Sequence, residues 1–122
     1  MANELSASVA LRFTKGNVDV EFHWLNKLFT VAGTDYTAKT QTIGTSEEAL
    51  DIGDCAAGGM ICVVNLDPTN YVSIRAATGG TNCVRVNALE GALFRFDAAG
   101  AAAPFAIANT GACQVAYLLV EP

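Results

Sequence analysis

Charged residues are scarce in this sequence: 16% of its 122 residues are Asp, Glu, Lys or Arg, against roughly 25% in an ordinary soluble domain. Apolar residues make up 52%, so the low charge does not indicate disorder, which goes with few apolar residues and a high net charge. A compact domain with so little charge either exposes small neutral residues or covers apolar surface through contacts. We favour the second, assembly with other protein copies.

Clusters of basic residues are absent too. The seven Lys and Arg residues never stand side by side, and the net charge is −5. Nucleic acids and anionic lipids both attract grouped basic side chains, so we expect neither nucleic acid nor a membrane as a partner. No secretory signal and no apolar run of membrane-spanning length is visible. We therefore expect the protein to be made in the cytoplasm of a cell.

Residue patterns for metal or cofactor chemistry are missing. The four cysteines, Cys55, Cys62, Cys83 and Cys113, form no C-x-x-C pair, which makes zinc improbable; we expect reduced cysteines in the core rather than disulfides. The acidic residues at 47–54 lack the alternating oxygen ligands of a calcium loop. We predict no metal and no cofactor.

The single histidine, His23, is the only candidate for a catalytic base. It alternates with Asp19 and Glu21, which would place all three on one face of a strand, where they could present ligands to a metal. A solvated polar face explains the same spacing, and we favour it. No serine or cysteine nearby is marked as an activated nucleophile, so we predict no catalytic residues and no enzyme.

The first 24 residues predict a long β-hairpin. Val9, Leu11 and Phe13 alternate with polar or small residues, and after the turn signal Lys15-Gly16-Asn17 the alternation resumes and includes Trp24. The stretch 25–32 is apolar without a clear period. Residues 1–14 either belong to the core sheet or form an extended N-terminal arm, and both alternatives stay open.

Short strands predict an all-β fold for the rest of the chain. Turn signals recur about every 10 residues between runs rich in Val, Ile, Phe and Tyr, as in sandwiches and barrels. We therefore predict one domain over residues 1–122, an antiparallel β-sandwich of jelly-roll type. The expected strands after the hairpin cover residues 36–45, 47–53, 60–66, 71–76, 83–89, 92–96, 105–108 and 113–120.

Four segments resemble small virion structural proteins of tailed bacteriophages: Glu47–Asp54, Asn65–Val72, Glu90–Phe96 and Ala108–Leu119. The resemblance covers roughly residues 40–122 and consists of turn and strand patterns. It implies a β-sandwich component of the virion and names no active site.

The resemblance predicts a capsid decoration or cement protein, made in the host cytoplasm and bound to the outer surface of the phage head. Its expected partners are the major capsid protein or other virion proteins and further copies of itself, as a dimer or trimer. Residues 5–13 could reach a neighbour by strand addition. The residues we expect in assembly contacts are Leu5, Val9, Leu11, Phe13 and Trp24.

Two other functions fit the same sequence. A tail, neck or fibre-associated protein of the phage would use the same sandwich. A small carbohydrate-binding module would instead expose Trp24 or Tyr71 as a stacking platform for sugars.

Overall fold

The computed structural model describes residues 4–96 and 103–121. The chain divides into two compact units, Met1–Ala32 and Gly33–Pro122. We expected a single sandwich domain over residues 1–122 with an open question about residues 1–14. The described part of residues 1–14 begins at residue 4. It lies in the first unit, in a hairpin that forms its own sheet.

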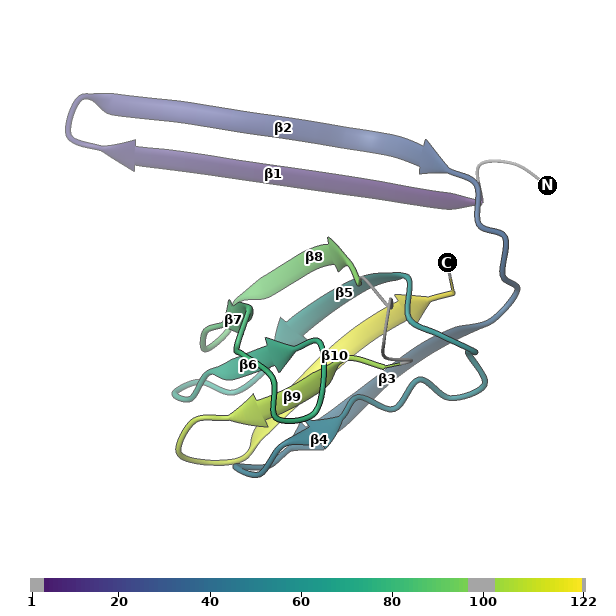
Figure 1. Cartoon of the computed structure of the whole chain (residues 1–122). Coiled ribbons are helices and arrows are strands. Elements are labelled where there is room, and N and C mark those ends of the chain that lie inside the picture. Colours follow the sequence, from purple (N-terminus) through teal and green to yellow (C-terminus); the bar gives the residue numbers. More distant parts are fainter. Residues whose placement is uncertain (1–3, 97–102, 122) are drawn as a thin grey trace. The chain divides into compact units, whose positions relative to one another are not determined.

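The first unit is the predicted hairpin, longer than expected. Strand β1 (Leu5–Lys15) pairs with β2 (Val18–Phe29) in an antiparallel two-stranded sheet (Figure 1). Gly16 and Asn17 form the turn, and Gly16 has a φ of 58°. A positive φ at the first of two turn residues suits the right-handed twist of a hairpin and favours glycine at that position.

The second unit is a sandwich of two four-stranded sheets, in which every strand pair is antiparallel. One sheet has the order β3-β10-β5-β8 and the other β4-β9-β6-β7 (Figure 1). The bounds of the first sheet are β3 (Tyr36–Ile43), β10 (Cys113–Val120), β5 (Met60–Asn65) and β8 (Gly91–Arg95). Those of the second are β4 (Glu48–Ala49), β9 (Phe105–Ala108), β6 (Val72–Arg75) and β7 (Val84–Val86).

This strand order confirms the jelly-roll prediction. Along the chain, the first of the eight sandwich strands pairs with the last, the second with the seventh, the third with the sixth and the fourth with the fifth. A long hairpin that folds back over itself gives this nested pairing, which defines a jelly roll. The described residues contain no helix.

The core lies between the two sheets and is built by alternation along each strand. On β10, Val115, Tyr117 and Leu119 are buried, while Leu118 is exposed. The other large buried side chains come from both sheets, Ile43, Ile61 and Val63 from one and Val72, Ile74 and Val86 from the other. Arg85 and Arg95 are exposed.

The cysteine prediction is right in one respect and wrong in another. All four cysteines are unpaired, and Cys55 and Cys113 are buried in the core. Cys62 and Cys83 are exposed. Cys62 alternates with the buried Ile61 and Val63 and therefore points out of the sandwich.

Three polar side chains hold the sandwich loops in place. The Asn65 side chain is completely buried, and its amide nitrogen donates to the carbonyl oxygens of Asn70, Val86 and Asn87. The Tyr117 hydroxyl donates to the Asp51 carbonyl oxygen at 2.7 Å. The Glu121 carboxylate accepts backbone N–H groups from three residues, Thr34, Asp35 and Ala56.

Candidate assembly surfaces

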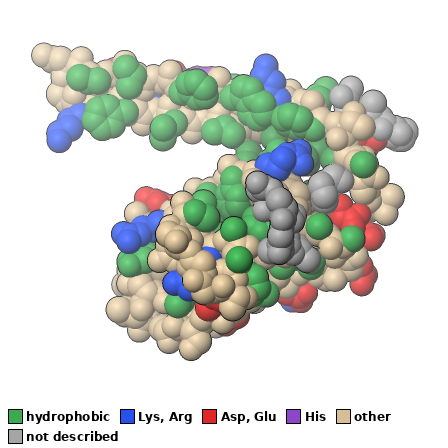
Figure 2. Space-filling view, viewed as in Figure 1, with side chains coloured by type: hydrophobic (Ala, Val, Ile, Leu, Met, Phe, Trp, Pro, Cys, Tyr) green, Lys and Arg blue, Asp and Glu red, His purple; other side chains and the backbone are tan. Residues whose placement is uncertain are grey.

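One face of the hairpin is almost entirely apolar. Val9 lies opposite Trp24, and Leu11 lies opposite Phe22; residues directly opposite in an antiparallel pair share a face. Figure 2 shows hydrophobic side chains in a row along this unit. The hairpin apolar face consists of Leu5, Ala7, Val9, Leu11, Phe13, Lys15, Val18, Val20, Phe22, Trp24, Lys27 and Phe29, and its two lysines are its only charged residues.

The side chains in the middle of this face are exposed. The exposed fractions are 71% for Leu11, 67% for Phe22, 57% for Val20 and 53% for Phe13. Single exposed apolar residues are normal, but contiguous ones mark an interaction surface. Trp24 is half-buried, its ring centroid 5.5 Å from that of Phe29.

A β-bulge lets this face run the full length of β2. The register shifts between Ala7 and Val9, because β2 has two residues, Leu25 and Asn26, opposite the single Ser8 of β1. Asn26 has a φ of 53°, and its N–H donates to the Ser8 hydroxyl oxygen at 2.9 Å. The extra residue reverses the alternation beyond it. Phe29 therefore returns to the same face as Trp24, which an unbroken strand would have prevented.

The opposite face of the hairpin carries most of its charge, in ion pairs. Arg12 donates to both carboxylate oxygens of Asp19, at 3.0 and 2.9 Å, and its Nε lies 3.3 Å from Glu21. His23 Nε2 lies 2.7 Å from Glu21. The shared strand face predicted for Asp19, Glu21 and His23 is therefore confirmed.

These carboxylates pair with Arg12 rather than converge on one point. Among the described residues no group of three His, Cys, Asp or Glu side chains could hold a metal ion. The arrangement fits a solvated polar face.

The sandwich presents a second apolar surface, on the outer side of the β3-β10-β5-β8 sheet. Leu118 lies between Ala38 and Cys62, and Cys62 in turn lies opposite Leu93. Arg95, on the edge strand β8, is the only charged residue at these positions. The sandwich apolar face consists of Tyr36, Ala38, Thr40, Thr42, Met60, Cys62, Val64, Gly91, Leu93, Arg95, Gln114, Ala116, Leu118 and Val120.

This second surface has fewer exposed large side chains than the hairpin face. They are Tyr36 at 68%, Leu118 at 43% and Val64 at 38%, and Ala and Thr lie around the last two. Small side chains let another backbone approach closely, so the face suits a broad, shallow contact.

The outer side of the other sheet differs because it carries charge. Arg75 on β6 lies 2.6 Å from Glu47 and donates to Asn82, and Glu47 also accepts the Gly79 N–H. The Arg75 hydrogen bond and then the Gly79 N–H lower the pKa of Glu47. Arg85 on β7 lies over an aromatic ring, as described below. This side of the sandwich therefore combines charged side chains in fixed contacts with the partly exposed Phe105 and Ile107 of β9.

The structure brings the five predicted assembly residues together. Leu5, Val9, Leu11, Phe13 and Trp24 all belong to the hairpin apolar face. The two residues expected to stack on sugars already have ring contacts within the chain. Trp24 packs on Phe29, and the Arg85 guanidinium lies 3.9 Å from the centroid of the half-buried Tyr71 ring.

The sequence did not predict two features of these surfaces, the position of Phe29 and the sandwich apolar face. Phe29 lies beyond the bulge, where the alternation reverses, and Asn26, a residue type that tolerates a positive φ, was the available signal. The sandwich apolar face combines alternate residues of four strands, so it becomes visible only when their pairing is known.

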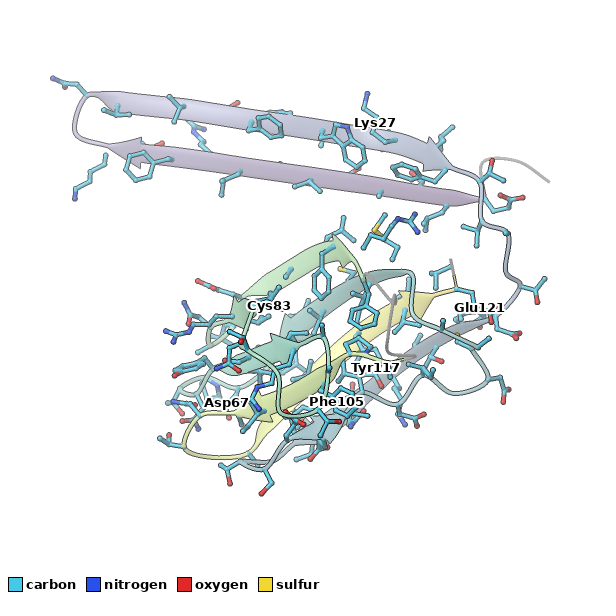
Figure 3. All side chains as sticks on the ribbon, viewed as in Figure 1. Lys27, Asp67, Cys83, Phe105, Tyr117 and Glu121 are labelled. Carbon is cyan, nitrogen blue, oxygen red and sulfur yellow. The ribbon has the colours of Figure 1, made fainter. Side chains whose placement is uncertain are left out.

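Figure 3 shows the side chains of both units. The labelled Tyr117 and Glu121 belong to the hydrogen-bonded groups described above, and the pKa of Tyr117 is raised to about 12 because of its burial. Three N–H donors lower the pKa of Glu121. These groups support the fold.

No protein-family model, curated protein or solved structure matches this chain. Within the described residues, no helix is long and apolar enough to cross a membrane. The fold and the two surfaces define the chain as a jelly-roll β-sandwich with an amphipathic hairpin.

Proposed function

We propose that this chain is a structural protein of a phage virion, a decoration or cement protein that binds the outer surface of the head and stabilises it. The observation that carries the proposal is the presence of two separate, almost uncharged apolar faces on one small chain. Further support comes from the resemblance to small virion proteins and from the jelly-roll fold, which viral capsid domains also use.

Two faces would let one chain contact its own copies and the shell at the same time. We assign the shell contact to the sandwich apolar face. A broad, shallow contact of small side chains binds weakly by itself, but copies that are linked to each other bind a repetitive surface with a summed strength. The proposed partners are the major capsid protein and further copies of this chain.

This role accounts for the unusual composition. Low charge would allow large parts of the surface to be covered by protein, and the scattered basic residues leave no site for nucleic acid or a membrane. The role needs no catalysis, metal or cofactor. The proposed location is the virion, after synthesis in the host cytoplasm.

The test of the role is the number of copies of this chain relative to the major shell protein in purified particles of the phage that encodes it. Quantitative mass spectrometry supplies that ratio. Abundance comparable to the shell protein is the expected result. A few copies per particle would assign the chain to the tail, neck or fibres, and its absence from particles would refute the virion role.

The shell contact is tested with particles that lack this chain and are then incubated with purified variants. Leu118→Glu places a charge in the middle of the sandwich apolar face, and we expect it to abolish binding. Arg85→Glu, on the exposed outer side of the other sheet, is the matched control and should bind as the unmodified chain does. Equal binding by both variants would contradict the assignment of this face.

The carbohydrate-binding alternative has less support. Arg85 lies against the ring of Tyr71, and Trp24 and Tyr71 belong to different units. A rise in melting temperature with any member of a glycan panel would favour it, because a ligand that binds only the folded state stabilises that state.

A further inference from the structure

The hairpin apolar face belongs to a sheet of only two strands. Two strands alone are marginally stable in water, and a sheet gains stability when a hydrophobic face packs against another layer. Here the central side chains of that face, among them Leu11, Phe13 and Phe22, are more than half exposed. A second apolar layer is therefore expected to cover them.

We propose that the hairpin apolar face packs against the same face of a second copy of this chain. The two hairpins would form a four-stranded, two-layer sandwich of their own and join the copies. This inference rests on the proposed assembly role and names the partner of one of its two surfaces.

Charge distribution favours a second copy. The acidic residues of β1 and β2, together with Arg12 and His23, occupy the opposite face. The register leaves Lys15 and Lys27 as the charged positions of the apolar face, one beside the turn and the other beside the bulge. Two copies can therefore meet along the stretch between these two lysines without burying a charge, and the lysines can extend their ammonium groups into water.

The available area also fits a pair of copies. Aromatic side chains have on the order of 150 to 250 Å² each to bury. With the lower value for Val and Leu, the exposed fractions correspond to roughly 600 Å² on each hairpin, summed over Val9, Leu11, Phe13, Val18, Val20 and Phe22. A pair would bury about 1,200 Å² in total, the lower end of the range for specific protein interfaces. The sandwich apolar face offers fewer large exposed side chains.

The symmetry of such a contact is simple. A face that packs on its own copy makes an isologous interface, which closes in a dimer and leaves neither hairpin apolar face open. Facing sheets pack about 10 Å apart, which places Trp24 in the buried layer between them. Trp24 is the single tryptophan of the chain, so its fluorescence reports this contact alone.

The first experiment measures the association of the purified full-length chain by analytical ultracentrifugation, together with its tryptophan emission over a dilution series. We expect a dimer, and a shift of the emission to longer wavelength as dilution separates the copies. A chain that sediments as a monomer at concentrations on the order of 100 μM, where an interface of this size should form, would overturn the inference.

Variants locate the contact. Leu11→Glu and Phe22→Glu put a carboxylate on the apolar face, and each should weaken dimerisation at least tenfold. Ala10→Glu is the matched control, because it adds the same charge one residue away, opposite His23 on the other face, and it should dimerise normally. Equal weakening by Ala10→Glu and Leu11→Glu would refute the proposed face.

A conservative pair separates loss of the contact from loss of the hairpin. Leu11→Met and Phe22→Leu keep an apolar side chain, so we expect both to retain the dimer, and the circular dichroism of every variant should retain the β signal of the hairpin. If the chain is abundant in particles but monomeric in solution, and Leu11→Glu abolishes particle binding, a virion protein covers the hairpin face. That result would reject this inference and leave the proposed function standing.

Discussion

Replacement of Asn65 by alanine should destabilise the sandwich strongly, because this side chain joins three segments of backbone. Its amide nitrogen donates to the carbonyl oxygens of Asn70 at 2.9 Å and of Val86 and Asn87 at 3.2 Å. Its carbonyl oxygen accepts the Asp67 N–H at 3.0 Å. The end of β5, the turn that follows and the end of β7 therefore meet at one buried amide.

The expected loss of unfolding free energy follows from these contacts. Each hydrogen bond contributes about 1 kcal/mol net, and each buried group left without a partner costs about 1 to 3 kcal/mol. A water molecule that enters the space left by the amide would restore part of this. We therefore expect Asn65→Ala to lower the free energy of unfolding by about 3 kcal/mol.

Urea unfolding followed by circular dichroism measures this loss. Trp24 lies in the other unit, so its fluorescence follows the hairpin in the same samples. The exposed Asn87 supplies the control: Asn87→Ala leaves the backbone carbonyl that accepts from Asn65 in place and should cost no more than about 0.5 kcal/mol. A loss below about 1 kcal/mol for Asn65→Ala would refute the reasoning.

Three further predictions concern pH and the hairpin turn. The raised pKa of Tyr117, about 12 against 10.0, stabilises the fold below pH 10 and this contribution disappears as pH rises to about 12; Tyr117→Phe should remove that slope from a plot of melting temperature against pH. The pKa of Glu47 is lowered from 4.5 by Arg75 and Gly79, so its contribution is present above pH 4.5 and is lost as pH falls through the lower folded value; Glu47→Gln should make acid unfolding less steep. Gly16→Ala meets no atom within 4 Å but keeps a φ of 58°, so it should weaken the hairpin alone by about 1 kcal/mol, which Trp24 fluorescence would detect.

Much of the strand structure could be predicted from local patterns. The runs at 105–108 and 113–120 match β9 and β10 to the residue, because turn residues bound them on both sides. The polar stretch at 36–45 contains β3, and the short run at 47–53 contains β4. The end of β2 was missed, because the bulge at Asn26 interrupts the alternation on which the prediction depended.

The candidate surfaces were predictable to different degrees. Five residues of the hairpin apolar face could be named because both strands are contiguous and joined by a short turn, so their register follows from the sequence. The exposure of Cys62 could not be foreseen. Whether a residue of an alternating strand points inward depends on which side of its sheet the second sheet covers.

By itself, the sequence determined the fold class, the hairpin and the alternation within each strand, since these depend on periods and turns only a few residues long. The tertiary structure alone decided the nested pairing of distant strands, such as β3 with β10, and with it the outer face on which Ala38, Cys62 and Leu118 meet. Residues far apart in the chain come together there because of pairing and layer packing, and no local pattern records which strands become neighbours.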